Sequence, residues 1–293
     1  MIAKKRKIFM KTILAATVII SSSTVLFQGL TQVAAAKEIE KKDIVMTSYD
    51  TISYQTAGES QSARARVPEG YVKANYTLTD NDLPYYRDKK PTDKDITRET
   101  AAEIGAQALW TVFDIDLEGK VLEMAYNPAT ADNRAIWEGC WWIDGKGKST
   151  QNYFFSVDAV TGELHTVQYA RTLKENASVG FDTTLAQNPQ EYEMLARNVA
   201  EQYDVVPGAV KLAEYANQGT SSNDPTIDIR VTGENGEQAQ ISFSRYDKAL
   251  LGIAYDSWCK EADVSAQNIE KEMQYWEEMP ASESTENMLA PRQ

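Results

Sequence analysis

The feature that most constrains the fold is one helical stripe followed by four short strand-like runs, because this order recurs later in the chain. After Thr97, the expected N-cap, apolar side chains recur at helical spacing up to Phe113, and we expect Gly119 to end the helix. Turn residues such as Thr161 and Gly162 separate the runs that follow. These runs are 120–126, 135–143, 152–158 and 163–171. A helix followed by antiparallel strands predicts an α+β fold.

The same order recurs from residue 186. Asn188 is the expected N-cap of a second helix, with Pro189 at its first position. The strand-like runs that follow are 209–216, 226–232, 238–246 and 250–257. A shift of 88 residues aligns Gly145 with Gly233, Phe155 with Phe243 and Ser156 with Ser244, whereas a shift of 90 aligns Phe113 and Asp114 with Tyr203 and Asp204. We therefore predict two tandem modules, 96–172 and 186–258, each a helix packed on an antiparallel sheet.

A last helix is predicted at residues 262–278. Its apolar residues alternate by four and three positions and form a narrow stripe: Ala262, Ala266, Ile269, Met273 and Trp276. We expect this helix to dock on a module or on a partner. Residues 259–293 are assigned to the helix and a disordered tail that follows it.

Residues 1–36 have the three parts of a secretory signal peptide. Basic residues from Lys4 to Lys11 precede an apolar stretch, and Ala34 and Ala36 form an A-x-A cleavage pattern. Two alternatives stay open: cleavage after Ala36, which we favour, and retention of the segment as a membrane anchor. Both predict an extracytoplasmic protein, either secreted or associated with the cell envelope.

Residues 37–95 are polar and show little periodicity, which predicts a stalk. Its later half contains Tyr71, Tyr76, Tyr85 and Tyr86, so we expect that half to pack on the following domain.

Charge and side-chain composition exclude several classes of function. The chain has 43 acidic and 30 basic residues, a net charge of −13, which argues against nucleic-acid binding. His165 is the only histidine, so a His-rich metal site is excluded, and we expect it to be a half-buried sheet residue. Asp114, Asp116 and Glu118 match a calcium loop, but Ala125 replaces the twelfth-position Glu, so an acidic turn is favoured. We expect no metal, cofactor or catalytic residue.

The aromatic residues are the candidate binding residues. On the strand through 135–143, Trp137 and Trp141 share one face, and Cys140 and Trp142 share the other. One aromatic face must cover the helix. The other face either binds a partner or is covered by the second module or the last helix. The candidate partner-binding residues are Trp137, Trp141, Trp142 and Phe154.

Residues 134–169 resemble the PepSY family. After the aromatic strand Trp137-Glu138-Gly139-Cys140-Trp141-Trp142, the run Val157-Asp158-Ala159-Val160-Thr161-Gly162-Glu163 is similar to the V-D-A-x-T-G-E hairpin of that family. The resemblance covers about 75 residues, and the second module departs from it with Arg245-Tyr246-Asp247-Lys248. It implies no catalytic residues. It implies a domain found in propeptides of secreted peptidases and in bacterial envelope proteins, often proposed to bind or inhibit peptidases.

The sequence thus predicts an exported, non-enzymatic binding or regulatory protein. The expected partner is a protein, such as a secreted or envelope peptidase. No nucleic acid is expected, and no membrane contact beyond an uncleaved anchor. No peptidase domain follows in this sequence, so we expect the partner to be a separate chain. The alternatives are a structural envelope protein and, with less support, a carboxylate-based hydrolase.

The two cysteines give opposing signals. Export and an even count favour a disulfide between Cys140 and Cys259. However, the shift of 88 residues aligns Cys140 with Asp228, so the two cysteines do not occupy equivalent positions. We predict two free thiols.

Overall fold

The computed structural model describes residues 67–130, 133–146, 150–175, 177, 180–220 and 222–278. The expected signal segment, the first part of the expected stalk and the C-terminal tail lie outside these residues. Every helix within them is too short or too polar to cross a membrane.

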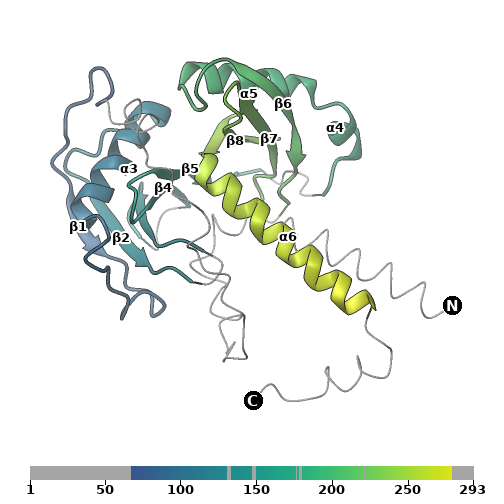
Figure 1. The fold of residues 1–293 in the computed structure, drawn as a ribbon. Helices are drawn as coiled ribbons and strands as arrows, with labels where there is room; N and C mark the ends of the chain where they lie inside the picture. Colours follow the sequence, from purple (N-terminus) through teal and green to yellow (C-terminus); the bar gives the residue numbers. More distant parts are fainter. Residues whose placement is uncertain are drawn as a thin grey trace.

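Nine strands form one continuous sheet in the order β1-β2-β3-β4-β5-β9-β8-β7-β6 (Figure 1). Only β1 and β2 pair in parallel; the other neighbours are antiparallel. The strands are β1 (Thr77–Asp80), β2 (Val121–Asn127), β3 (Ile136–Trp142), β4 (Gln151–Asp158), β5 (Leu164–Arg171), β6 (Val210–Asn217), β7 (Thr226–Gly233), β8 (Gln238–Ser244) and β9 (Leu250–Ala254). The helices are α3 (Arg98–Phe113), α4 (Thr183–Gln187), α5 (Gln190–Gln202) and α6 (Asp256–Glu278).

The α+β class is confirmed. The strands of both predicted modules belong to a single sheet, however, joined where β5 pairs with β9. The division into two modules therefore stays a prediction.

The first helix begins as predicted and ends earlier. The side chain of Thr97 accepts a hydrogen bond from the backbone of Thr100, which confirms the N-cap. Asp114 adopts the left-handed conformation, with φ of 55°; its N–H donates to the carbonyl of Trp110, and the N–H of Ile115 donates to that of Leu109. The helix thus ends at Phe113, and Gly119 lies in the turn before β2.

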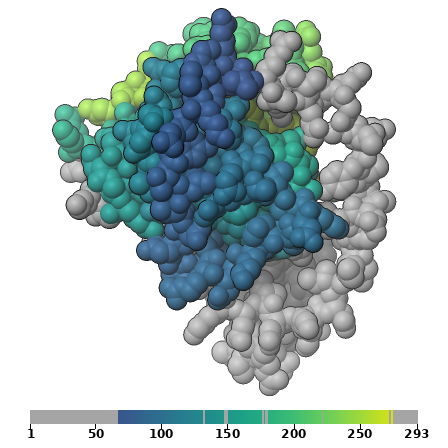
Figure 2. Space-filling view, turned by 90° about the vertical axis from the view of Figure 1, so that its left-hand side faces the viewer, coloured from purple at the N-terminus to yellow at the C-terminus, as the bar shows by residue number. Residues whose placement is uncertain are grey.

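Residues 67–95 of the expected stalk lie against the sheet and α3. Tyr71 and Tyr76 donate hydrogen bonds to Glu103 on α3, over 2.9 and 3.1 Å. Tyr86 donates to Glu138 on β3 over 2.6 Å. Figure 2 shows these first described residues, in dark blue, lying across this side of the molecule.

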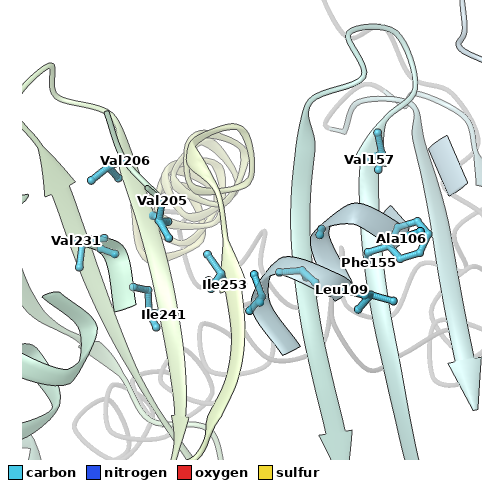
Figure 3. Packing of buried hydrophobic residues seen from close by; sticks show 14 of the residues in the cluster. Ala106, Leu109, Phe155, Val157, Val205, Val206, Val231, Ile241 and Ile253 are labelled. Atoms are coloured by element: carbon cyan, nitrogen blue, oxygen red, sulfur yellow. The ribbon is translucent and has the colours of Figure 1, made fainter. Parts of the chain in front are cut away.

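One hydrophobic core lies between the sheet and the helices α3 and α5. Phe155, Val167 and Ile253 pair across β4, β5 and β9, so they share a face, and all three are fully buried. They belong to one cluster with Leu109 of α3 and with Ile241 of β8 (Figure 3). Both helices therefore cover the same face of the sheet.

The first turns of α6 cover the opposite face. Asp263 on α6 accepts a hydrogen bond from Arg230 of β7 at 2.7 Å, and Trp258 and Cys259 pack against Ala254. The helix begins at Asp256, not at residue 262, because β9 ends at Ala254. Cys259 is thus buried on a helix, whereas Cys140 lies on β3; both thiols are free, as predicted.

The predicted start of the second helix is wrong. Asn188 does not cap α5; it is the C-cap of the short helix α4, and its side chain donates to the carbonyl of Thr184. Asp182 caps α4 by accepting from Leu185, and Pro189 occupies the N-cap of α5 without a side-chain hydrogen bond.

Strand registers in the two halves of the sheet correspond, but not at a shift of 88. Val157 pairs with Leu164 at a register irregularity, and Phe243 pairs with Leu250 at the same irregularity, 86 residues later. Phe243 therefore corresponds to Val157 and not to Phe155. On β3 and β7 the offset is 90, because Ile136 pairs with Asp158 and Thr226 with Ser244. The offset falls from 90 to 86 residues because the connection between β7 and β8 is shorter than that between β3 and β4. The shift of 88 found in the sequence lies midway between these two offsets.

Candidate functional site

Trp137 belongs to the hydrophobic core. Its side chain is 5% exposed, and its indole N–H donates to the backbone carbonyl of Ile96 at 2.9 Å. Its ring also packs against Tyr126. The residue ties the segment before α3 to the sheet, so its ring has no free face for a partner.

Trp141 shares this face but is half-buried. Its ring stacks on Tyr153 at 5.7 Å, and Tyr153 stacks on Tyr169 at 4.7 Å, which makes a row of rings across β3, β4 and β5. Phe113, at the end of α3, packs against two of these rings. Because stacked rings cover one another's faces, this row offers mainly ring edges to a partner.

Trp142 and Phe154 lie on the face opposite to α3. Trp142 pairs with Asn152, and Phe154 pairs with Cys140, so the two rings are diagonal neighbours on one face. Both side chains are half-buried. We name these two residues the Trp142–Phe154 patch. Of the four predicted binding residues, these two share a surface away from both core helices.

The Cys140 thiol lies beside this patch and is largely shielded from water. It accepts a hydrogen bond from the side chain of Asn152 at 3.3 Å. Burial raises the pKa of the Cys140 thiol to about 12, so it stays protonated near neutral pH.

His165 lies between β5 and α6. Its Nδ1 is 3.3 Å from the Ser257 hydroxyl, and its Nε2 is 3.5 Å from a carboxylate oxygen of Glu261. A serine, a histidine and a glutamate in contact are the components of a hydrolytic triad. Here the histidine is 4% exposed and the serine 7%, and burial lowers the pKa of His165 to about 4. The histidine is a buried residue of the sheet rather than a half-buried one.

The only predicted residue of this group was His165. Ser257 and Glu261 follow it by more than ninety positions. Ser257 was predicted to end the last strand-like run, and Glu261 to lie one residue before the helix predicted at 262–278, whereas both lie on the first turns of α6. If the helix had been predicted to start at Asp256, Ser257 and Glu261 would have been placed four residues apart on one face of it.

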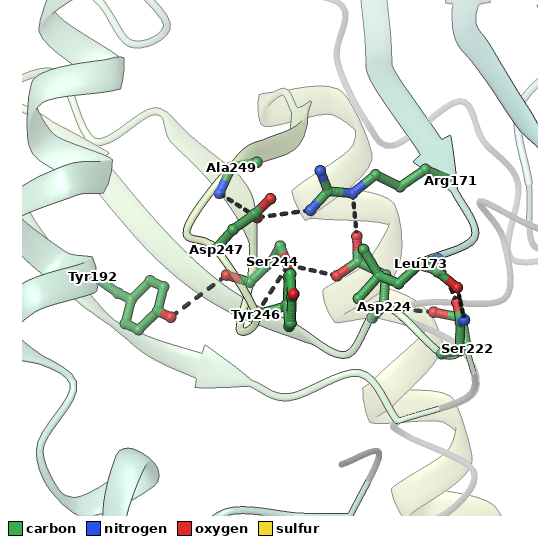
Figure 4. A network of polar contacts seen from close by, with 10 residues as sticks. Arg171, Leu173, Tyr192, Ser222, Asp224, Ser244, Tyr246, Asp247 and Ala249 are labelled. Atoms are coloured by element: carbon green, nitrogen blue, oxygen red, sulfur yellow. Dashed lines mark hydrogen bonds and ion pairs between the residues drawn. The ribbon is translucent and has the colours of Figure 1, made fainter. Parts of the chain in front are cut away.

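A polar network connects the two halves of the sheet beyond the ends of β5 and β9 (Figure 4). Arg171, at the end of β5, donates to Asp224 at 2.6 Å and to Asp247 at 2.7 Å. Asp224 is 3% exposed and also accepts from the hydroxyl of Ser244. These residues are more than fifty positions from Arg171, and no local motif predicts their contact.

Burial raises the pKa of three described carboxyl groups, Asp228, Glu138 and Glu261. Burial raises the pKa of Asp228 to about 6, against the opposing hydrogen bonds from Ser242 and Asn217. Burial also raises the pKa of Glu138, which accepts from Tyr86. Each carboxyl group is held within the fold, and Asp228 is only 3% exposed, so it is not placed to reach a substrate.

The other sequence motifs are turns. Asp116 accepts from the backbone of Glu118 at 2.8 Å, and the Glu118 carboxylate accepts from the backbone of Asn75 at 2.6 Å. No group of three or more His, Cys, Asp or Glu side chains suited to a metal ion occurs in the described part of the chain. Gly145, with φ of 86°, lies in the connection between the antiparallel strands β3 and β4.

Comparison with known proteins does not identify a family for this chain. No family model matches this chain, and no curated protein matches it significantly. A solved structure, the Bacillus megaterium YpeB C-terminal domain, is similar at 12% identity and a TM-score of 0.34. The match covers 56% of this chain and 65% of that chain, less than two thirds of its length. A likeness at this TM-score is too weak to assign a fold or a function.

Proposed function

We propose that this chain is an exported, non-enzymatic protein that binds and regulates a secreted or envelope peptidase. We further propose that it consists of two tandem PepSY-like modules fused into one sheet. The observation that carries the binding proposal is the Trp142–Phe154 patch, two neighbouring aromatic side chains that no core helix covers.

The correspondence of strand registers supports the tandem arrangement. Thr166 pairs with Ala254, Val167 with Ile253 and Gln168 with Gly252. With the offset of 86 residues, this pairing is symmetric about Val167 and Ile253. Asp114 and Asp204 also correspond, since each follows a helix and each has a positive φ. Two copies of one ancestral module, paired edge to edge about a two-fold axis, would give these correspondences.

The surroundings of the reactive side chains support a non-enzymatic role. The only imidazole of the chain is sealed between β5 and α6, and burial keeps it neutral at pH 7. Both thiols have pKa values raised by burial to about 12. A general base or a nucleophile must reach the substrate atom on which it acts.

The binding proposal is tested by capture from envelope extract. The bait is the exported chain, and the test variants are Trp142→Ala and Phe154→Ala. Phe181→Ala is the matched control, since Phe181 is an aromatic residue 56% exposed on the other half of the chain. We expect stoichiometric capture of a peptidase by wild type and control and loss of capture by both test variants, with unchanged thermal melting.

Two results would favour the alternatives. Capture of wall polymer or of the chain itself alone would indicate a structural envelope protein. Turnover of a peptide or glycoside substrate, abolished by substitution of a single Asp or Glu, would indicate a carboxylate-based hydrolase.

A further inference from the structure

The first two turns of α6, residues 256–263, contact the sheet through a small apolar cluster of their own. Trp258 and Cys259 pack against Ala254 of β9, and the half-buried Ala262 lies at the margin of this cluster. Among the residues that the structure describes, none of α6 belongs to the larger cluster that α3 and α5 share with the other face of the sheet. The contact of α6 with the sheet is therefore separate from the main core, and beyond it the helix extends away from the sheet (Figure 1).

The remaining contacts of these turns are polar, and they reach both halves of the sheet. On the first half, the Ser257 hydroxyl lies 3.3 Å from Nδ1 of His165 on β5. On the second half, Asp263 accepts a hydrogen bond from Arg230 of β7 at 2.7 Å, and the Asp263 side chain is 47% exposed. Water can replace such contacts at a small net cost, because it hydrogen-bonds the same groups. These contacts hold the turns in place without preventing their release.

The strand positions next to this contact are polar, and some of their groups lack partners. Ala254 pairs with Thr166 on one side and with Gln240 on the other, and Gln240 pairs with Arg230. The Nε of Arg230 is buried without a hydrogen-bond partner. Gln240 is 3% exposed, and its side-chain amide makes no hydrogen bond to any residue that the structure describes. Buried polar groups without partners are unfavourable, and detachment of the helix would let water reach them.

This polar face continues the Trp142–Phe154 patch. Phe154 pairs directly with Gln168, and Gln168 pairs with Gly252, two residues before Ala254. Residues two apart on a strand lie on the same face of the sheet. One face therefore runs from the patch on the first half to the position on β9 against which α6 packs. Without α6 in place, that face would extend across the junction of β5 and β9.

We infer that residues 256–263, which we name the α6 strap, detach from the sheet as a unit and uncover a polar extension of the Trp142–Phe154 patch. Segments with few buried apolar contacts open at a lower free energy than the whole fold. The inference deepens the proposed function and rests on it, because it assigns a regulation to the face that binds the partner. The detachment itself requires no partner.

Cys259 is a natural reporter of detachment. Its side chain is fully buried in the contact with the sheet, so a thiol reagent reaches it only when the strap is detached. The assay uses the full chain with Cys140→Ser, which leaves Cys259 as the only thiol, and N-ethylmaleimide as the reagent. The slowest-exchanging amides of β5 and β8, measured in parallel, report opening of the whole fold.

We expect the opening equilibrium of Cys259 to be at least about tenfold larger than that of these amides. Its labelling rate should also depend little on urea below the unfolding transition, because detachment of two helical turns exposes little surface.

Two alanine variants on the strap provide a matched comparison. Asp263→Ala removes the ion pair with Arg230 and should speed the labelling of Cys259 about two- to fivefold. Lys260→Ala is the control, because the exposed Lys260 pairs with Asp256 of the same helix, and its labelling should equal that of the parent protein. If the partner binds the uncovered face, its apparent affinity rises with the population of the detached state. Asp263→Ala bait at a limiting concentration should then capture more peptidase, by the same factor.

Three results would overturn the inference: labelling of Cys259 only with the opening of the slowest amides, equal labelling of Asp263→Ala and Lys260→Ala, or faster labelling of Asp263→Ala without increased capture. The labelling assay contains no partner. Its failure with intact capture from envelope extract would therefore discard the strap alone. Local labelling of Cys259 with no peptidase captured by any variant would discard the proposed partner and, with it, the regulatory role of the strap.

Discussion

At the scale of single residues, Phe155 determines how closely α3 approaches the sheet. Its ring is fully buried between Gly105 on α3 and Gly139 on β3. A Cβ at either glycine would lie 2.1 Å from a ring carbon, far inside van der Waals contact. Both positions therefore require glycine because of space and not because of backbone conformation.

Gly139→Ala should lower the free energy of unfolding by about 1–3 kcal/mol, because the new methyl group forces the ring or α3 to move. Gly180→Ala is the control, since nothing lies within 4 Å of a Cβ there and its φ is not positive; its effect should stay within about 0.5 kcal/mol. Urea denaturation measures both. Equal losses in the two variants would refute the packing argument.

His165 gives the fold a dependence on pH. The charged groups around it are Asp158, Arg134 and Glu261, and burial dominates, lowering the His165 pKa from 6.5 to about 4. Between these two values the unfolded chain binds the proton and the folded chain does not. This group therefore stabilises the fold less as pH falls below about 6.5.

Relative to His165→Gln, the wild type should lose about 2 kcal/mol of unfolding free energy between pH 7 and pH 5. Asp228, with its raised pKa of about 6, titrates with the opposite sign, but it is present in both proteins and cancels in the difference. Urea titrations of both proteins at several pH values provide the test. Parallel curves would show that His165 is not the responsible group.

At the scale of elements, the junction of β5 and β9 is supported by the Arg171 network. β5 and β9 pair at three residue positions only. Arg171 adds ionic hydrogen bonds from the first half of the sheet to Asp224 and Asp247 of the second. Because Asp224 is 3% exposed, water cannot solvate its carboxylate, and the guanidinium of Arg171 is the cation that compensates it.

Arg171→Met should cost about 3–5 kcal/mol, because it leaves Asp224 buried without a cation. Asp247→Asn removes only the outer partner, whose side chain is 39% exposed, and keeps an oxygen for the backbone of Ala249. It should cost less than about 1 kcal/mol. Chemical denaturation of the two variants, compared with wild type, tests the difference. Similar costs would mean that Asp224 is adequately stabilised by Ser244.

Elements bounded by turn residues were predictable from the sequence, and short or unbounded ones were not. β2 to β5 lie within one residue of their predicted bounds, since Gly145 and Gly162 mark the turns. β1 and α4 span four and five residues, too few to show a period. The start of α6 was missed because Asp256 and Ser257 were included in the last strand-like run, although both are residue types that favour the start of a helix.

The candidate site was predictable only where the alternation of side chains along a β-strand determines which face of the sheet a residue occupies. Two-residue alternation correctly separated Trp141 from Trp142. It could not show that Trp137 is buried, because that depends on the Ile96 carbonyl from a loop. The contacts of His165 and Arg171 join residues distant in sequence, and a single sequence carries no signal for such pairs.

At the scale of the whole molecule, we expect the larger buried cluster of the described residues, which spans both halves of the sheet, to determine how the protein unfolds. One buried cluster includes α3 and β2 to β5 of the first half and α5 and β6 to β9 of the second. Ile253, fully buried on β9, pairs with Val167 across the junction and with Ile241 on β8. A cavity at this position removes contacts from both halves at once.

Ile253→Ala should therefore lower stability by about 2–4 kcal/mol and should do so equally for both halves. Hydrogen exchange at increasing urea, read separately on the amides of β2–β4 and β6–β8, measures this. We expect both sets to share one transition in wild type and to shift together in the variant, since cooperative units follow shared cores. If β6–β8 opens at lower urea while β2–β4 stays protected, the halves are independent domains, and the continuous sheet is only their contact.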